Sequence, residues 1–302
     1  MKAEEKQVGR YSATTTALLY LDGVVYLPIC EEMRKRLDAF EVDGIEDGGM
    51  IEYLTRKKKE GRFPVYQTTE RPDRAAQAIL EGRVVLLTDN SPEALIFPAT
   101  LNSLFQTADD YYRNERIVTF LRLIRYVAAF LALALPGLYV AAATFHPQLL
   151  PGNLIRSMAE ARSGVPFPTA AEVLLMELSF ELLREAGLRM PGPAGNTIGI
   201  VGGLIVGQAA VRANLVSPIT VTVAALTALG SFSIPNEELS EVFRLWKYGI
   251  LLLGSCFGIL GVMLGCFLLL MLMAEQESYG IPWLYPYVGG NLNERADEKD
   301  SM

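Results

Sequence analysis

Long apolar runs fill the second part of the chain, whereas charged residues recur every few positions in the first. From Tyr126 to Ala274 the charges gather in short clusters between the apolar runs. A membrane-spanning helix needs about 20 mainly apolar residues, because the hydrocarbon core is about 30 Å thick. Four segments meet this requirement, namely 126–145, 197–211 extended by the neutral residues before it, 216–234 and 248–274. The pattern therefore predicts membrane helices that follow a water-soluble head.

Strand and helix patterns alternate in the head. Apolar spacing predicts a strand over 16–22, helices over 31–40, 50–58 and 68–80, and a strand, turn and strand over 84–97. The head contains no phosphate-binding glycine loop, metal-ligand spacing or nucleophile elbow. We therefore interpret it as a small α/β regulatory or assembly domain.

Three regions follow from this contrast. They are a cytosolic α/β domain over 1–112, a transmembrane helical domain over 113–288 and an acidic tail over 289–302. The predicted fold class is an α+β membrane protein, in which a small cytosolic α/β head precedes a polytopic α-helical transmembrane bundle. Four arginines crowd the start of the first span, at positions 113, 116, 122 and 125, and the positive-inside rule places the head in the cytoplasm. The N-terminal residues offer no apolar stretch for a cleaved signal.

Composition excludes several classes of function. The net charge of −7 argues against a nucleic-acid surface, which needs a basic excess. The three cysteines are far apart, so they indicate neither a disulfide framework nor a zinc site. His146 is the only histidine and lies in a predicted outward loop, which disfavours a nucleophile–histidine relay. We therefore expect neither an enzyme nor a cofactor.

A fifth hydrophobic segment, 169–183, carries ionisable side chains that continue beyond its end. On a helix several of them fall within about 100° of one another and form a polar stripe. A charge in hydrocarbon costs at least about 2.5 kcal/mol, so the stripe must face the bundle interior, a water-filled path or the interface. A paired cluster that fixes helix packing, an ion path and an interfacial helix all remain open. The candidate residues for an ion path or gate are Glu172, Glu177, Glu181, Arg184, Glu185 and Arg189.

Small residues recur along two of the predicted spans. Gly199, Gly203 and Gly207 remove side-chain bulk from one helix face, which favours close helix packing. In the next span Thr220, Thr227 and Ser231 share a face that suits either a narrow wet pore or ordinary helix contacts. The side on which the acidic tail lies depends on whether 169–183 is a full span or a re-entrant segment. A loop over 236–247 is expected on the cytoplasmic side.

An ordered series of short strings resembles the A subunits of spore germinant receptors, the GerA family. The strings extend over nearly the whole chain, and their order makes the resemblance specific. They are Thr69–Asp73, Leu80–Arg83, Asp109–Tyr112, Pro136–Tyr139, Val165–Pro168, Met176–Glu177, Arg184–Pro191, Gly199–Gly203, Gly207–Val211 and Tyr279–Pro282.

The resemblance implies a nutrient-sensing receptor component in the spore inner membrane. Such A subunits are thought to form a homo-oligomeric ring around an ion channel that triggers germination. The implied partners are a transporter-like B subunit, a C-subunit lipoprotein and membrane lipid, without nucleic acid. Family members usually carry a further N-terminal subdomain and a longer basic tail, so this chain is expected to be a short variant or a fragment.

Three other functions are compared with this hypothesis. The same fold family implies a component of the spore ion-release machinery as one alternative. A secondary transporter is another, although no inverted repeat is evident in the sequence. A membrane enzyme ranks last, because only the carboxylate and arginine cluster offers reactive groups.

Overall fold

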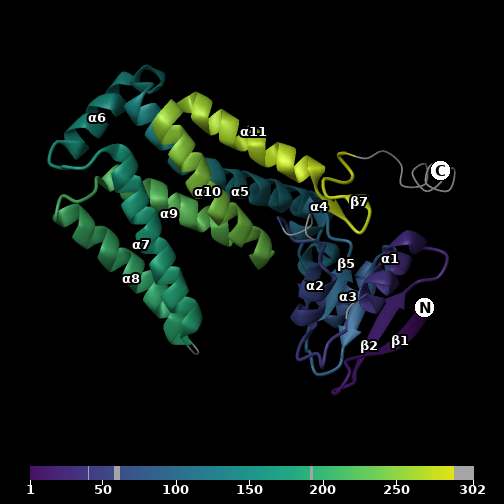
Figure 1. The fold of residues 1–302 in the computed structure, drawn as a ribbon. Helices are drawn as coiled ribbons and strands as arrows, with labels where there is room; N and C mark the ends of the chain where they lie inside the picture. The colour runs from purple at the N-terminus through teal and green to yellow at the C-terminus, as the bar shows by residue number, and fades with distance from the viewer. Residues whose placement is uncertain (40, 58–61, 191–192, 289–302) are drawn as a thin grey trace. The chain divides into compact units, whose positions relative to one another are not determined.

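The computed structural model describes residues 1–39, 41–57, 62–190 and 193–288. The chain divides into two compact units. The first, called the head unit, is formed by residues 1–122, 235–239 and the described residues from 270 onward. The second, called the helical unit, is formed by 123–234 and 240–269. Figure 1 labels the elements of both units in chain order.

A five-stranded sheet organises the head unit, in the order β1–β2–β4–β5–β3. Its strands are β1 Lys2–Val8, β2 Thr14–Tyr20, β3 Gln67–Thr69, β4 Val84–Thr88 and β5 Ala94–Phe97. All neighbouring strands pair antiparallel, so strand and helix alternation along the chain does not produce a parallel sheet here. The helices of this region are α1 Leu27–Asp38, α2 Gly48–Thr55, α3 Pro72–Leu80 and α4 Leu101–Leu104.

The two edge strands lack the pattern that revealed the inner strands. β1 consists largely of charged residues and is mostly exposed, and β3 is only three residues long. By contrast, β2 alternates between buried and half-buried positions, and all four residues of β5 are buried. Sequence periodicity therefore predicted the interior of the sheet but missed both of its edges.

The segment after the last helix completes the core of the head unit. We call residues 276–285 the C-terminal strap; it contains the short strands β6 Glu277–Ser278 and β7 Ile281–Pro282. Trp283 is fully buried, and its Nε1 donates a hydrogen bond of 2.7 Å to the carbonyl oxygen of Pro64. Ser278 Oγ donates to the carbonyl oxygen of Val65 at 2.6 Å. The structure thus groups the strap with the head unit, whereas the predicted limits 113–288 grouped it with the membrane helices.

Seven helices account for most of the rest of the described chain. They are α5 Glu115–Thr144, α6 Gly152–Arg162, α7 Thr169–Arg189, α8 Pro193–Arg212, α9 Pro218–Phe232, α10 Glu237–Phe257 and α11 Ile259–Glu275, with 3₁₀ turns over Ala108–Tyr112 and Pro147–Leu149. Within the described residues, α5 alone is both long and apolar enough to cross a membrane by length and composition. Helices α9 and α11 are apolar but shorter. The fold is therefore a mixed, mainly helical one.

The single span predicted over 248–274 is wrong, because the chain turns sharply between α10 and α11 (Figure 1). Gly258 occupies the turn with φ of +64°, a conformation that glycine adopts without a Cβ penalty. A Cβ on Gly261 would lie 2.0 Å from the carbonyl oxygen of Leu253, so the two helices approach too closely for any larger residue. The loop predicted over 236–247 is also wrong, because α10 begins at Glu237.

Candidate functional site

Helix α7 carries the predicted polar stripe on one continuous stretch. It begins after Pro168, which terminates the preceding segment, and has an acidic residue in its first turn, where the helix dipole favours negative charge. The side chains of Glu172, Val173, Met176 and Glu177 are buried, so this helix packs apolar and acidic groups against its neighbours.

Two acidic residues of α7 pair with two basic residues of α10. Glu177 Oε2 and Lys247 Nζ are 2.6 Å apart, and only 2% and 4% of these side chains are exposed. One turn further along α7, Glu181 pairs with Arg244. The two acidic residues are four positions apart on α7, so they lie on one face of that helix. The two basic residues are three positions apart on α10 and likewise share a face. We call these four residues the α7–α10 ion-pair cluster.

Burial makes the Glu177–Lys247 pair of this cluster energetically demanding, whereas 36% of the Glu181 side chain is exposed. An ion pair removed from water loses hydration that its mutual attraction offsets only with good geometry, and loss of one partner leaves an uncompensated charge. Two atoms of the cluster, Glu177 Oε1 and Arg244 Nε, are buried without a hydrogen-bond partner in the described part of the chain. The cluster therefore combines tight pairing with unused hydrogen-bonding capacity.

Glu172 belongs to a separate polar contact. Its side chain is fully buried, and its Oε1 accepts a hydrogen bond of 3.0 Å from Arg162 Nε. Its Oε2 accepts from the backbone N–H of Ser217 at 2.9 Å and from Thr220 Oγ1 at 3.1 Å. Because Ser217 is the N-cap of α9, Glu172 adds a carboxylate to the start of that helix. This arrangement links α6, α7 and α9.

The C-terminal end of the stripe is exposed. Glu185 and Arg189 pair with each other along α7 at 2.7 Å, with 57% and 80% of their side chains exposed. The guanidinium of Arg184 lies 5.1 Å from the centre of the Phe232 ring. The structure therefore brings only Glu177 and Glu181 of the six predicted residues into the ion-pair cluster.

The three predicted hydroxyl residues of α9 are buried within the helical unit. Thr220 contacts Glu172, Thr227 donates to the carbonyl oxygen of Val223 at 2.9 Å, and Ser231 donates to that of Thr227 at 3.1 Å. These three bonds satisfy the hydroxyl groups locally. A pore-lining role for these residues stays a prediction about the assembled protein.

The small residues of α8 allow close packing where the structure describes their surroundings. A Cβ on Gly203 would lie 3.2 Å from Phe180 of α7, and one on Gly207 would lie 3.2 Å from Val221 of α9. The surroundings of Gly199 lie outside the described residues. At these two glycines, α8 approaches α7 and α9 closely.

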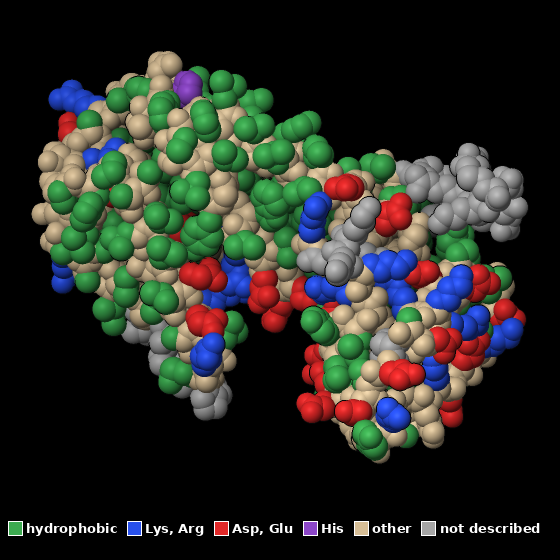
Figure 2. Space-filling view, viewed as in Figure 1, with side chains coloured by type: hydrophobic (Ala, Val, Ile, Leu, Met, Phe, Trp, Pro, Cys, Tyr) green, Lys and Arg blue, Asp and Glu red, His purple; other side chains and the backbone are tan. Residues whose placement is uncertain are grey.

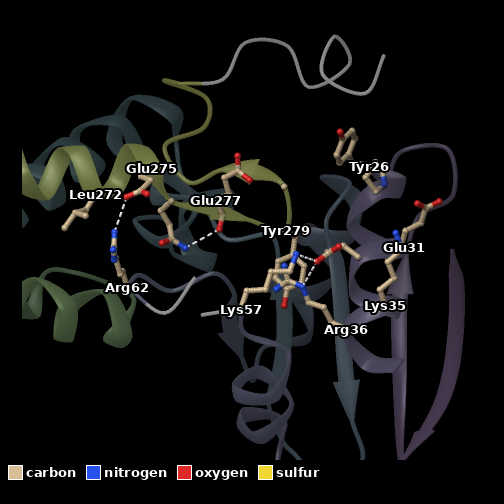
Figure 3. Close-up of a pocket in the computed structure, with 14 residues that line it drawn as sticks. Tyr26, Glu31, Lys35, Arg36, Lys57, Arg62, Leu272, Glu275, Glu277 and Tyr279 are labelled. Atoms are coloured by element: carbon tan, nitrogen blue, oxygen red, sulfur yellow. Dashed lines mark hydrogen bonds and ion pairs between the residues drawn. The ribbon is translucent and has the colours of Figure 1, made fainter. Parts of the chain in front are cut away.

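A polar cleft of about 630 Å³ lies in the head unit between α1 and the C-terminal strap (Figure 3). Its charges are largely paired with one another. Glu32 pairs with Lys57 at 2.5 Å and with Arg36 at 2.9 Å, which together hold the pKa of Glu32 below its usual value. Arg62 pairs with Glu275 at 3.1 Å. Among the described residues, no group of three or more His, Cys, Asp or Glu side chains is arranged to hold a metal.

Comparison with known proteins assigns the family. The model of the family described as Bacillus/Clostridium GerA spore germination protein matches residues 1–300. The chain belongs to the GerA family. This confirms the resemblance found in the sequence.

Three curated relatives of this GerA-family chain come from Bacillus subtilis. Spore germination protein KA is 38% identical over 283 residues, covering 94% of this chain and 52% of the relative. Spore germination protein A1 is 38% identical over 279 residues, with coverages of 92% and 58%. Uncharacterized membrane protein YfkQ is 40% identical over 278 residues, with coverages of 92% and 54%. The chain thus spans about half the length of these relatives.

One solved structure is also similar. It is the N-terminal domain of the A subunit of the Bacillus megaterium spore germinant receptor GerK3. The sequence identity is 33%, the match covers 33% of this chain and 39% of that one, and the TM-score is 0.24.

Sequence reasoning missed the basic half of the ion-pair cluster in this GerA-family chain. Arg244 and Lys247 were assigned to the end of a loop between two predicted spans, although acidic residues in the same segment fit a cytoplasmic turn only moderately well. The missed signal is the helical spacing of Leu239, Phe243 and Ile250, all of which are buried. A helix drawn through those positions would have indicated that Lys247 can face a neighbouring helix.

Proposed function

We propose that this chain is part of the A subunit of a nutrient-sensing germinant receptor, which oligomerises in the spore inner membrane to form an ion channel. The observation that carries the proposal is the α7–α10 ion-pair cluster. It buries carboxylate and ammonium groups among helices whose outer faces are apolar. Such placement is costly and is typical of groups that gate or line a path through a membrane.

The outer faces of the helices support a polytopic arrangement. Leu260, Met263 and Phe267 of α11 are 73%, 62% and 62% exposed, and Leu229 and Phe232 of α9 are similarly exposed. In Figure 2, hydrophobic side chains are spread over the visible surface of the helical unit with few charged ones among them, whereas Lys, Arg, Asp and Glu crowd the head unit. An apolar surface of this extent in water would promote aggregation, but it suits contact with lipid.

The turn at Gly258 supports a re-entrant arrangement of α10 and α11. Residues 235–239, where α10 begins, and residues from 270 onward, where α11 ends, both belong to the head unit. The buried Trp283 follows α11 and packs in the head core. With the arginine-rich start of α5 on the cytoplasmic side, the head and the strap both lie in the cytoplasm in this arrangement.

In the proposed channel, the ion-pair cluster with its charges paired corresponds to the closed state. While Lys247 and Arg244 occupy the carboxylates of Glu177 and Glu181, those carboxylates are not available to a passing ion. Movement of α10 along α7 would separate the pairs and expose two acidic groups together. The transporter-like B subunit and the C-subunit lipoprotein, implied by the family, would supply the nutrient signal for that movement.

The test is ion release from the reconstituted protein. Glu177→Gln and Glu181→Gln are compared with Glu185→Gln, a matched control whose exposed carboxylate pairs with Arg189 along α7. In liposomes that contain the B and C partners, we expect the first two variants to alter germinant-triggered conductance and the control to leave it unchanged. Normal insertion of both variants with unchanged conductance would reject a role for the cluster in the channel.

A secondary transporter is the second candidate, and the interrupted helix at Gly258 favours it. Transporters build binding sites from helices that are broken near the middle of the membrane. The two functions differ in assembly and turnover. A channel subunit purifies as a homo-oligomer with partner-dependent conductance, whereas a transporter works as a monomer and takes up solute without partners.

A further inference from the structure

Two of the family strings, Thr69–Asp73 and Asp109–Tyr112, play no part in the site described above. In the head unit they meet at the place where the chain leaves the sheet for α5. The first string leads into α3, and the second forms most of the 3₁₀ turn, which two residues separate from the start of α5. We call the residues that join them the α3–α5 junction, namely Arg71, Arg74, Asp109, Asp110, Tyr111 and Arg122.

The outer side of the junction is centred on Arg71. Its Nη2 and Nε donate to the carboxylate of Asp73 at 2.7 and 3.1 Å, and its Nη1 donates to Asp109 at 2.9 Å. Tyr112 OH donates to the same Asp73 carboxylate at 3.2 Å. The start of α3 is therefore tied to the 3₁₀ turn at two points, by Arg71 to Asp109 and by Tyr112 to Asp73.

The inner side of the junction is buried. Arg74 is 3% exposed and donates to Tyr111 OH at 2.8 Å and to Gln67 Oε1 at 3.2 Å. Tyr111 OH in turn donates to Gln106 Oε1 at 2.9 Å. Burial raises the pKa of Tyr111, so its hydroxyl stays protonated and keeps donating. The 3₁₀ turn is thus contacted by Arg71 on its exposed side and by Arg74 on its buried side.

Asp110 extends the junction into α5. It is 5% exposed and accepts hydrogen bonds from the N–H and the Oγ1 of Thr107, at 3.3 and 3.0 Å, which caps the 3₁₀ turn. Its Oδ2 also accepts from Arg122 Nε of α5 at 3.4 Å. The same carboxylate therefore contacts the turn and the helix that follows it.

We propose that the α3–α5 junction holds the first turns of α5 in place within the head unit and transmits movement of the sheet to that helix. This inference rests on the proposed channel function. The exposed pairs of Arg71 are each worth only about 0–1 kcal/mol, whereas the contacts of Arg74 and Asp110 are buried. The position of the turn gives the three contacts a role besides stability: only Arg113 and Asn114 separate the turn from α5, which is the described helix best suited to cross a membrane.

The test measures geometry and ion release in the same full-length protein with its B and C partners in lipid. Spin labels at Gln77→Cys on α3 and Ile117→Cys on α5 report the distance between the two helices, after the native cysteines are replaced by serine. The variants are Asp109→Asn and Asp110→Asn, the second of which keeps an acceptor for the Thr107 cap. Arg116→Gln, on the first turns of α5, is the matched control.

We expect a narrow distance distribution for the unmodified junction and for the control, and a broad one for both junction variants. The ratio of triggered to spontaneous ion release should fall by roughly 5–10-fold in the junction variants, as expected for a typical coupling between sites. A narrow distribution in the variants overturns the positioning role, and a broad distribution with an unchanged ratio overturns transmission. Absence of triggered release from the unmodified protein rejects the channel and the coupling together, which separates that failure from a failure of the junction alone.

Discussion

The two units of this protein contrast in the burial of two of their ion pairs and of two pairs of apolar side chains. In the head unit, Leu86 and Ile96 are fully buried, while the ion pair between Lys2 and Asp22 leaves more than half of each side chain exposed. In the helical unit, Leu260 and Met263 are exposed, while the pair between Glu177 and Lys247 is almost completely buried.

The difference is the one expected from the proposed placement, in which the head unit meets water and the helical unit meets lipid. Water favours charges on the outside, and the hydrophobic effect drives apolar residues inward. Lipid is as apolar as leucine, so apolar residues gain little from leaving it and charged residues must turn inward to find partners. Four experiments test this contrast.

The largest effect is expected from Lys247→Met. The substitution leaves the Glu177 carboxylate buried without its cation, which should cost about 3–5 kcal/mol. Unfolding in mixed detergent micelles, followed by far-ultraviolet circular dichroism, measures the loss. Lys2→Met in the head is the control. Adding Glu177→Gln should restore most of the stability, and a double variant no better than the single one would show that charge pairing is not the cause.

A charge on the outer face of α11 should have the next largest effect. Met263→Arg introduces a cation where the proposal places lipid, at a cost of about 2.5–3.5 kcal/mol. Retention in the membrane after alkaline carbonate washing and the unfolding midpoint report that cost. Tyr53→Arg, at an exposed site of the head, should change stability by less than about 0.5 kcal/mol. Equal effects at both sites would contradict a lipid-facing α11.

Trp283→Phe examines the C-terminal strap. It removes the donor to the Pro64 carbonyl oxygen, and an unpaired buried acceptor costs about 1–3 kcal/mol. Hydrogen exchange should accelerate over residues 62–66 and 276–283 while the helices keep their protection. Trp246→Phe in α10 should leave those two segments unchanged. Unaltered exchange after Trp283→Phe would mean that the strap does not stabilise the head.

The smallest effect concerns the exposed pair between Glu4 and Arg34. Two hydrogen bonds from Arg34, at 2.6 and 2.7 Å, together with one from Tyr20, lower the pKa of Glu4. Because the pKa of Glu4 is lower in the folded state than in the unfolded state, the pair adds stability at pH values above the unfolded-state pKa of about 4.3. This stability is lost as the pH falls through the folded-state pKa. Glu4→Gln should therefore cost less than about 1 kcal/mol at pH 7 and progressively less below about pH 4. Urea titrations over this range measure the change, and a difference that grows in acid would contradict it.

The sequence predicted the inner strands and most helices, because burial on one face leaves a periodic pattern. It missed β1, whose exposed edge position leaves no apolar alternation, and it merged α10 with α11. An apolar run of that length is compatible with one tilted membrane-spanning helix and also with two shorter helices joined by a turn. The close approach of Gly261 to Leu253 shows that the second arrangement is the one present. Half of the α7–α10 ion-pair cluster was predicted from the sequence. The helical periodicity of α7 revealed Glu177 and Glu181, but local periodicity does not show which distant helix supplies their basic partners.

The strap also constrains the order of events during synthesis. Trp283, Tyr279 and Ser278 leave the ribosome only after every helix from α5 to α11 has been translated, yet the head core needs them. The core of the head unit is therefore incomplete until α11 has been translated. A chain truncated before the strap would lack the side chain that donates to the Pro64 carbonyl oxygen.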